Sequence, residues 1–215
     1  MNKALKTIKL IEEQVMSFKI PWVTVESKKK NPYRVLISCI LSLRTKDKTT
    51  ADASNRLFRL ADTPQKMMKL AASRIQKLIY PVGFYRNKAK VILGISRKIL
   101  DEFRGQVPNN LEDLLKFKGV GRKTANLVLG LGYKIPAICV DTHVHRISNR
   151  LGWVKTKEPH ATEEALQKLI PKSYWIRLNT VMVAFGQNLC VPVSPFCSRC
   201  YVNEYCRKIG VTRSR

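Results

Sequence analysis

Four cysteines fall within 17 residues of one another, and their spacing points directly to chemistry. They follow the pattern C-x6-C-x2-C-x5-C and are Cys190, Cys197, Cys200 and Cys206. Thiolates this close together suit a zinc ion or an iron–sulfur cluster, and the alternative is four thiols that bind no metal. Zinc ribbons contain two C-x2-C pairs, whereas this pattern has one. Its other two spacings, x6 and x5, are longer and fit a loop wrapped around a group larger than a single ion. The spacing favours an iron–sulfur cluster and leaves zinc open.

A second stretch whose residues could carry out chemistry is a glycine hairpin followed by a lysine. Gly119-Val120-Gly121 lies between two helical patterns, and Lys123 comes two residues later. Two glycines let the backbone take positive φ and approach another molecule closely. Their amides at a helix N-terminus form an anion site. Such a hairpin is expected to grip phosphate whatever base is attached, and an ordinary corner between two helices is the alternative.

An acidic residue follows in the run V-D-T-H. Asp141 stands where a helix N-cap is expected, directly ahead of a helical pattern. A carboxylate at a helix start stays ionised, so capping and chemistry are compatible. We expect the chain to return and bring Asp141 toward Lys123. His143 and His145 are expected to be structural rather than metal ligands, because the four-cysteine site is already complete.

Helical periodicity dominates the elements that must position these residues. Apolar side chains at helical spacing run from Leu5 to Val15, from Val91 to Phe103 and from Trp175 to Phe185. Gly105 is expected to end the second of these helices. Strand-like runs are short, such as 135–140, and no alternating pattern recurs. The chain is therefore predicted to be all-α, with helices of about 8–15 residues joined by short loops.

Local signals predict further helix boundaries. Ser73 with Gln76 fits a capping box. Asn109 with Glu112 marks the start of a short helix before the hairpin. Residues 212–215 are expected to fray.

The charge balance points to a polyanionic partner. The 215 residues include 40 Lys and Arg against 15 Asp and Glu, a formal net charge of +25. This charge is compatible with binding to DNA, RNA, an anionic membrane or an acidic protein. The alternative is a Lys-rich surface that only confers solubility. With 45% hydrophobic residues, a buried core is expected. No apolar run reaches the about 20 residues of a membrane helix. No secretory signal is read, so a cytoplasmic protein is expected.

Two more segments complete a set of motifs, L-S-L-R-T-K-D at 41–47 and V-G-F-Y-R-N-K-A at 82–89. Together with the hairpin, the V-D-T-H run and the cysteine spacing, they make the sequence resemble the endonuclease III family of DNA glycosylases. This family belongs to the helix–hairpin–helix superfamily with a Gly/Pro-rich loop and a catalytic Asp. The resemblance covers nearly the whole chain and favours iron–sulfur over zinc.

The resemblance implies two helical domains with a DNA cleft between them. A six-helix domain over 23–135 would carry the helix–hairpin–helix motif. Residues 1–22 and 136–215 would form the second domain, with a four-iron, four-sulfur (4Fe-4S) cluster on the four cysteines. In the family the cluster loop brings basic residues to phosphate, and Arg199, Arg207 and Lys208 are the candidates here. A monomer is expected, because one damaged base needs no second subunit.

The resemblance also implies a mechanism of base excision repair. Lys123 would attack the sugar C1′ of a damaged nucleoside, displace the base and leave a Schiff base, from which β-elimination nicks the strand. Asp141 would assist deprotonation of the amine and stabilise positive charge on the sugar. The expected substrates are oxidised pyrimidines in duplex DNA. His143 is a candidate residue of the pocket.

The base must leave the duplex to reach such a site, and side chains must fill the gap. By resemblance, Arg44 supplies the plug and Phe84 the wedge, with core packing as the alternative for Phe84. The candidate DNA-binding residues are Gly119, Val120, Gly121, Arg44, Phe84 and Arg199. Family members often carry Gln where Arg44 stands and Pro where Lys118 stands. These departures are expected to alter the preference for the orphaned base and to loosen the hairpin.

Other functions stay open at this point. A mismatch glycosylase of the same fold, removing uracil, thymine or adenine, is disfavoured by Lys123, because monofunctional relatives usually lack that lysine. A non-catalytic DNA-binding or redox-sensing protein would keep the fold and the cluster. A zinc-module protein would hold no iron.

Overall fold

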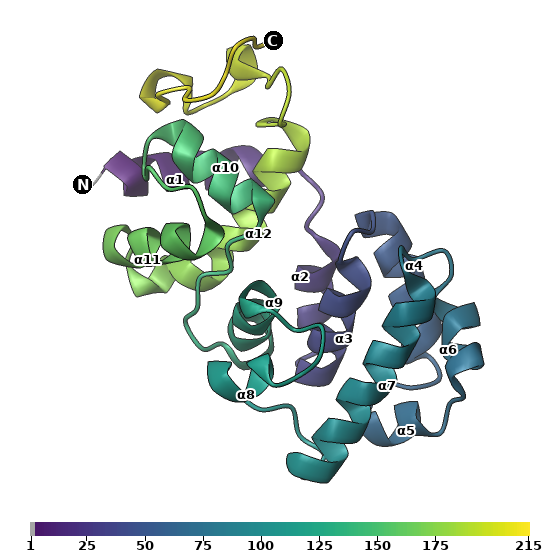
Figure 1. Cartoon of the computed structure of the whole chain (residues 1–215). Coiled ribbons are helices and arrows are strands. Elements are labelled where there is room, and N and C mark those ends of the chain that lie inside the picture. The colour runs from purple at the N-terminus through teal and green to yellow at the C-terminus, as the bar shows by residue number, and fades with distance from the viewer. Residues whose placement is uncertain (1–2) are drawn as a thin grey trace. The chain divides into compact units, whose positions relative to one another are not determined.

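The computed structural model describes residues 3–215, and every regular element within them is helical, with no β-strand. The prediction of an all-α chain is confirmed. The chain divides into two compact units, one of Trp22–Ile135 and one that combines Met1–Pro21 with Pro136–Arg215 (Figure 1). None of the described helices is long and apolar enough to cross a membrane.

The Trp22–Ile135 unit is built around α3 (Pro32–Ser42), of whose 11 residues eight are buried. The side chain of Asn31 caps this helix by accepting from the N–H of Arg34, and Pro32 occupies its first position. The elements packed against α3 are α2 (Trp22–Ser27), α4 (Asp47–Phe58), α7 (Tyr85–Glu102), α9 (Arg122–Leu127) and the π-helical η1 (Val128–Gly132). Two short helices, α5 (Pro64–Met68) and α6 (Ala72–Ile79), pack on α7, and α8 (Leu111–Leu115) packs on α9.

The predicted end of α7 is confirmed. Gly105 has a φ of +78°, and its N–H donates to the carbonyl of Ile99 at 2.9 Å. Arg104 before it has a φ of 53°, so two consecutive left-handed residues turn the chain away from the helix, and glycine adopts this conformation without steric cost.

Two predicted helix starts are wrong. Asn110, rather than Asn109, caps α8, because its Oδ1 accepts from the N–H of Asp113 at 2.9 Å. The capping box at Ser73 does not form, because α6 begins one residue earlier and places Ser73 inside the helix. Asn109 and Asn110 offer nearly equivalent caps in the sequence, whereas the N-cap of α6 is Ala71, which makes no side-chain cap bond and gives no signal in the sequence.

The second unit contains α1 (Lys3–Val15), α10 (Thr142–Leu151), α11 (Pro159–Leu169), α12 (Lys172–Asn188) and the 3-10 turns η2 (Cys197–Arg199) and η3 (Asn203–Tyr205). Apolar side chains of α1, α10, α11 and α12 share one core. Trp153 Nε1 donates to Thr7 Oγ1 of α1 at 3.1 Å. His145 of α10 has the structural contact expected of it, since its Nδ1 lies 2.7 Å from Thr162 Oγ1 of α11.

The short strand-like run 135–140 forms no strand, in agreement with the all-α prediction, and buries Ile138 and Cys139 in an irregular connection to α10. One expectation in this unit is corrected, because the C-terminal residues are bonded to the cysteine loop. The Arg215 N–H donates to the carbonyl of Pro195 at 2.8 Å, and its guanidinium lies 3.8 Å from the ring centroid of Phe196.

Candidate active site and cysteine loop

The glycine hairpin between α8 and α9 is closed by its own backbone. Gly119 has a φ of +83°, and the N–H of Val120 donates to the carbonyl of Phe117 at 3.0 Å. Phe117 is buried against Phe103, which anchors the turn. One expectation is corrected here, because Gly121 has a φ of −98° and Gly119 alone of the two hairpin glycines uses positive φ. The amide of Val120 is bonded within the hairpin and its side chain is 6% exposed, and its contact with DNA stays a prediction.

Lys123 is the second residue of α9, and it is exposed. Thr124, Ala125 and Asn126 are buried, which anchors the helix and leaves Lys123 on its outer side. Burial raises the pKa of the Cys39 thiol in α3 to about 12, and the positive charge of Lys123 acts against this shift. The amine therefore lies within electrostatic reach of α3 while remaining open to solvent.

Asp141 caps α10, as predicted. Its Oδ1 accepts from the N–H groups of His143 and Val144, both at 2.9 Å, and the residue is 9% exposed. Amides at a helix start stabilise the ionised carboxylate. Within residues 3–215 these two bonds engage Oδ1, which leaves Oδ2 as the oxygen for a proton or a cation. Lys123 and Asp141 belong to different units, and their pairing stays a prediction.

His143 is held by residues that lead to the cysteine loop. Its Nδ1 lies 3.2 Å from Nη2 of Arg146, which also donates to the carbonyl of Cys190 at 2.8 Å. A Cβ at Gly186 of α12 would lie 2.4 Å from this Nδ1, so the close approach requires glycine. His143 therefore has a defined position, and its role in a pocket stays a prediction.

Arg44 and Phe84 lie together although they are far apart in the sequence. Both have left-handed backbones, with φ of 52° and 58°. The guanidinium carbon of Arg44 lies 4.9 Å from the ring centroid of Phe84. Phe84 is 61% exposed, so the alternative that it packs in the core is wrong. An exposed aromatic ring next to a cation suits contact with nucleobases.

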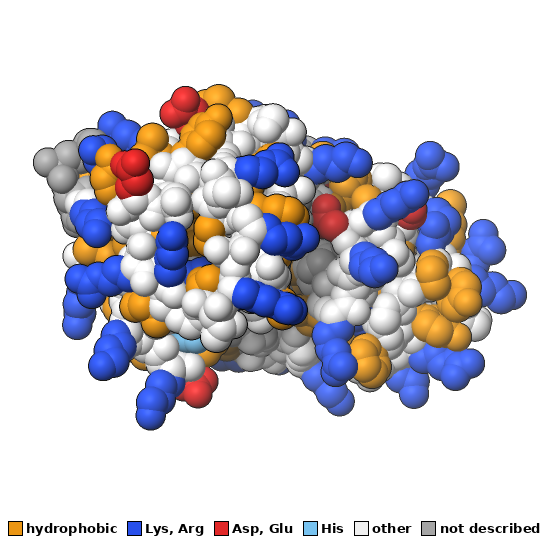
Figure 2. Space-filling view, turned by 90° about the horizontal axis from the view of Figure 1, so that it is seen from above, with side chains coloured by type: hydrophobic (Ala, Val, Ile, Leu, Met, Phe, Trp, Pro, Cys, Tyr) orange, Lys and Arg blue, Asp and Glu red, His pale blue; other side chains and the backbone are white. Residues whose placement is uncertain are grey.

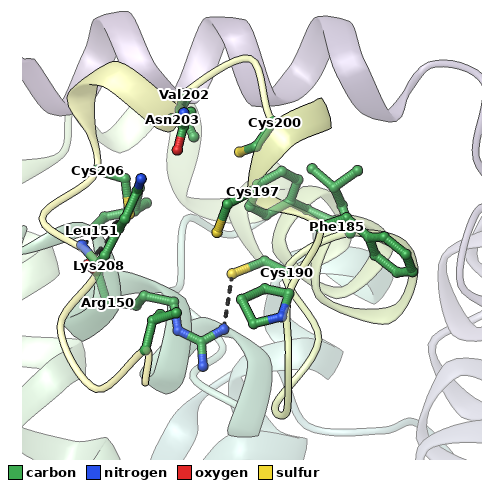
Figure 3. A pocket seen from close by; sticks show the side chains of 14 residues that line it. Arg150, Leu151, Phe185, Cys190, Cys197, Cys200, Val202, Asn203, Cys206 and Lys208 are labelled. Carbon is green, nitrogen blue, oxygen red and sulfur yellow. Dashed lines mark hydrogen bonds between the residues drawn. The ribbon is translucent and has the colours of Figure 1, made fainter. Parts of the chain in front are cut away.

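The four cysteines line one cavity. The sulfur atoms of Cys190, Cys197 and Cys200 point into the same space, with Cys206 on its other side (Figure 3). Burial, and to a smaller extent charge on the other three thiols, raises the pKa of Cys200 to about 11, so the thiols lie close enough to influence one another electrostatically. In the part of the chain that is described, no three His, Cys, Asp or Glu side chains form a site for a single metal ion.

Hydrogen-bond donors surround this cavity. Nη1 of the buried Arg150 donates to Cys190 Sγ at 3.3 Å and to the carbonyl of Val191 at 2.9 Å (Figure 3). The backbone N–H of Lys208 donates to Cys206 Sγ at 3.3 Å. Four thiols, N–H donors to sulfur and a buried cation suit an anionic thiolate cluster. The residues present therefore fit a 4Fe-4S group.

Basic side chains also surround the cysteine loop. Arg199, Arg207 and Lys208 are exposed. The loop is tied to α1 by Gln14, whose Nε2 donates to the carbonyl of Arg199 at 2.6 Å and whose Oε1 accepts from the N–H of Tyr201 at 3.1 Å. On the face shown in Figure 2, Lys and Arg side chains greatly outnumber Asp and Glu. This agrees with the net charge of +25.

Sequence reasoning missed three cations that organise these regions. Arg146 and Arg150 stand one helical turn apart on α10, a spacing that puts both on one face. Lys88 is 5% exposed and precedes Ile92 and Ile95 on the buried stripe of α7. A lysine at a stripe position was a readable signal, because lysine is almost never buried without partners.

The comparisons with known proteins agree with this fold and these motifs. Residues 37–172 match the sequence profile described as "HhH-GPD superfamily base excision DNA repair protein". The endonuclease III of Thermotoga maritima is 51% identical over 179 residues, which cover 83% of this chain and 84% of that protein.

Two solved structures are similar along most of their length. A non-covalent endonuclease III–DNA complex has a TM-score of 0.86 and 32% identity, covering 97% of this chain and 96% of its own. A trapped endonuclease III–DNA covalent intermediate, an estranged-adenine complex, has a TM-score of 0.78 and 36% identity, covering 83% and 84%. The chain therefore belongs to the HhH-GPD superfamily of base excision DNA repair proteins and, within it, to the endonuclease III family. It is a DNA glycosylase of base excision repair.

Proposed function

We propose that the protein is a bifunctional glycosylase and abasic-site lyase that acts on oxidised pyrimidines in duplex DNA. The observation that carries this proposal is the exposed Lys123 at the second position of α9, directly behind the glycine hairpin. When the hairpin holds a DNA phosphate, an amine at this point can reach the sugar next to that phosphate. The same proposal makes duplex DNA the partner and a monomer the active form.

The reaction begins when neutral Lys123 Nζ attacks C1′ of the damaged nucleoside. The C1′–N bond breaks, and the base leaves with that electron pair and takes up a proton. The amine nitrogen passes one proton to Asp141, the C1′–O4′ bond breaks as the sugar ring opens, and O4′ takes up a proton, which leaves a protonated Schiff base between Nζ and C1′. Loss of a proton from C2′ then expels the 3′ phosphate by β-elimination and nicks the strand. Hydrolysis of the Schiff base releases Lys123.

Asp141 serves this reaction as an anion and a proton acceptor. Its Oδ1 is committed to the two amides at the start of α10, so Oδ2 takes the proton of the attacking amine or faces the positive charge that develops on the sugar. A carboxylate that is fixed by backbone amides needs little reorganisation during the reaction.

DNA is held by backbone and side chains with different tasks. Gly119, Gly121 and Arg199 contact phosphates, which positions the duplex without reading its sequence. Arg44 and Phe84 enter the space that the extruded nucleotide leaves, which keeps the neighbouring bases stacked. Both side chains are exposed and adjacent, as this task requires.

The cysteine loop holds a 4Fe-4S cluster on Cys190, Cys197, Cys200 and Cys206. When bound, the cluster supplies a rigid covalent frame for the loop that carries Arg199, and the excision chemistry belongs to Lys123 and Asp141. Iron analysis of the purified protein tests this part. About four iron atoms per chain and a brown colour support the cluster, and stoichiometric zinc without iron contradicts it.

Strand nicking of abasic duplex DNA tests the lyase proposal. Lys123→Gln should abolish nicking, whereas Lys118→Gln, which removes an exposed lysine from the same hairpin, should weaken DNA binding and leave the single-turnover rate within about threefold. Full nicking by Lys123→Gln would disprove the assignment. A panel of duplexes with oxidised pyrimidines, uracil, or mismatched thymine and adenine then identifies the substrate class.

A further inference from the structure

The ammonium group of Lys88 is buried in the first turn of α7. Its Nζ donates to the carbonyls of Leu41 and Leu43, at 2.8 and 2.5 Å, and lies 3.2 Å from Thr45 Oγ1. Within residues 3–215 no carboxylate pairs with it. All three of its N–H donors therefore serve the end of α3 and the loop that follows. Carbonyls at a helix C-terminus favour a cation, which is why a buried lysine is tolerated here.

Thr45 connects the same loop to the turn before α7. Its Oγ1 accepts from the N–H of Gly83 at 3.2 Å, in addition to its contact with Lys88. A Cβ at Gly83 would lie 2.7 Å from the carbonyl oxygen of Arg44, so the two backbones touch at this point. Loop 43–45 and turn 83–84 are thus joined by a small, partly buried network that Lys88 completes.

The residues that project from this network are Arg44 and Phe84. Both hold left-handed backbone conformations that non-glycine residues rarely adopt. Such conformations persist where surrounding contacts over-determine them. The bonds from Lys88 flank Arg44 on both sides, at Leu43 and Thr45, and Lys88 also closes the turn that begins at Phe84, with its N–H 3.0 Å from the Phe84 carbonyl.

We propose that Lys88 is a positioning residue that locks Arg44 and Phe84 into one preformed wedge, which enters the duplex as a unit when the damaged base is extruded. The inference rests on the proposed insertion of these two side chains into DNA. Lys88 itself is buried and fully engaged, so it touches neither the phosphates nor the extruded base. Its effect passes through the two strained loops, which would otherwise have to be ordered during insertion.

A double-mutant cycle between Lys88→Met and Phe84→Ala tests this coupling. The measurement is single-turnover excision of one thymine glycol from a paired duplex. Each single variant should lower the rate about tenfold or more, and the double variant should be no slower than the slower of the two single variants, because both act on the same wedge. Lys90→Met, which removes an exposed charge from the same helix, should stay within about twofold of the wild type.

The outcomes separate this inference from the function on which it rests. Additive losses, or a Lys88→Met variant with the wild-type rate, would overturn the role of Lys88 while insertion of Phe84 stands. If Phe84→Ala kept the wild-type excision rate, both the insertion of Phe84 and the wedge would be disproved, whereas the assignment of lyase activity to Lys123 would stand. If Lys88→Met fails to fold, Thr45→Val takes its place in the cycle. It removes the hydroxyl that joins Gly83 to Lys88, and the same non-additivity is expected.

Discussion

Two lysines of this chain show how surroundings decide what one residue type does. Lys123 is exposed behind the glycine hairpin, where we propose that it attacks a DNA sugar, and Lys88 is buried under two loops with every donor engaged. The first was predictable because a lysine next to a glycine hairpin and an aspartate 18 residues further along the chain form a recognisable set. The second was not, because its partners are backbone carbonyls of a segment more than 40 residues away in the sequence.

The burial of Lys88 predicts how the stability of the protein depends on pH. Burial lowers the pKa of Lys88 from its ordinary value to about 8. Between this pH and the ordinary lysine pKa of about 10.4, the unfolded chain binds the proton more tightly than the folded one. The contribution of Lys88 to the free energy of unfolding should therefore rise with pH over this range. Urea unfolding of wild type and Lys88→Met at pH 7 and pH 10 measures it, and a wild type that loses stability relative to the variant contradicts it.

At the scale of the element, the two hairpin glycines have separable roles. Gly119 needs its positive φ, and an added Cβ would lie 3.2 Å from Val91, whereas Gly121 has an ordinary φ and open space around its Cα. Gly119→Ala should cost about 1–2 kcal/mol of stability. Gly121→Ala should leave stability unchanged and weaken DNA binding, because its methyl group stands where phosphate approaches. Thermal unfolding and titration with duplex DNA check both, and full affinity in Gly121→Ala would contradict the proposed contact.

The start of α10 allows capping and chemistry to be distinguished. Asn caps helices about as well as Asp, so Asp141→Asn should keep the stability of the wild type and still lose at least about 100-fold in base excision. Asp141→Ala should lose the activity and also about 1 kcal/mol of stability. Chemical unfolding and single-turnover excision separate the two effects. An active Asp141→Asn would limit Asp141 to capping.

Helix interiors were more predictable than their boundaries. The stripe from Val91 to Phe103 and the terminating Gly105 were read correctly, because helical periodicity and a left-handed cap are local properties. The starts near Ser73 and Asn109 differ from the prediction by one or two residues, because Asn110 caps as well as its neighbour Asn109 and because α6 follows Ala71, which carries no capping side chain. The C-terminal tail was misjudged because its anchors, Pro195 and Phe196, belong to the cysteine loop.

For the whole molecule, the net charge of +25 predicts DNA binding that depends steeply on salt. Each phosphate neutralised contributes a slope of about −0.9 to the plot of log affinity against log salt concentration. Lys118→Gln should make the slope shallower by about 1 if that lysine contacts a phosphate. Fluorescence anisotropy with undamaged duplex at several KCl concentrations measures both slopes. A flat dependence for the wild type would show that the charge serves something other than DNA.

Covalent trapping is the most direct test of Lys123 as the nucleophile. Sodium borohydride reduces a Schiff base to a stable amine, so wild-type protein incubated with an abasic duplex should form a covalent protein–DNA adduct. Digestion and mass spectrometry should then place the modification on Lys123, and Lys123→Gln should form no adduct while Lys118→Gln forms it normally. An adduct on another residue, or an undiminished adduct in Lys123→Gln, would contradict the account.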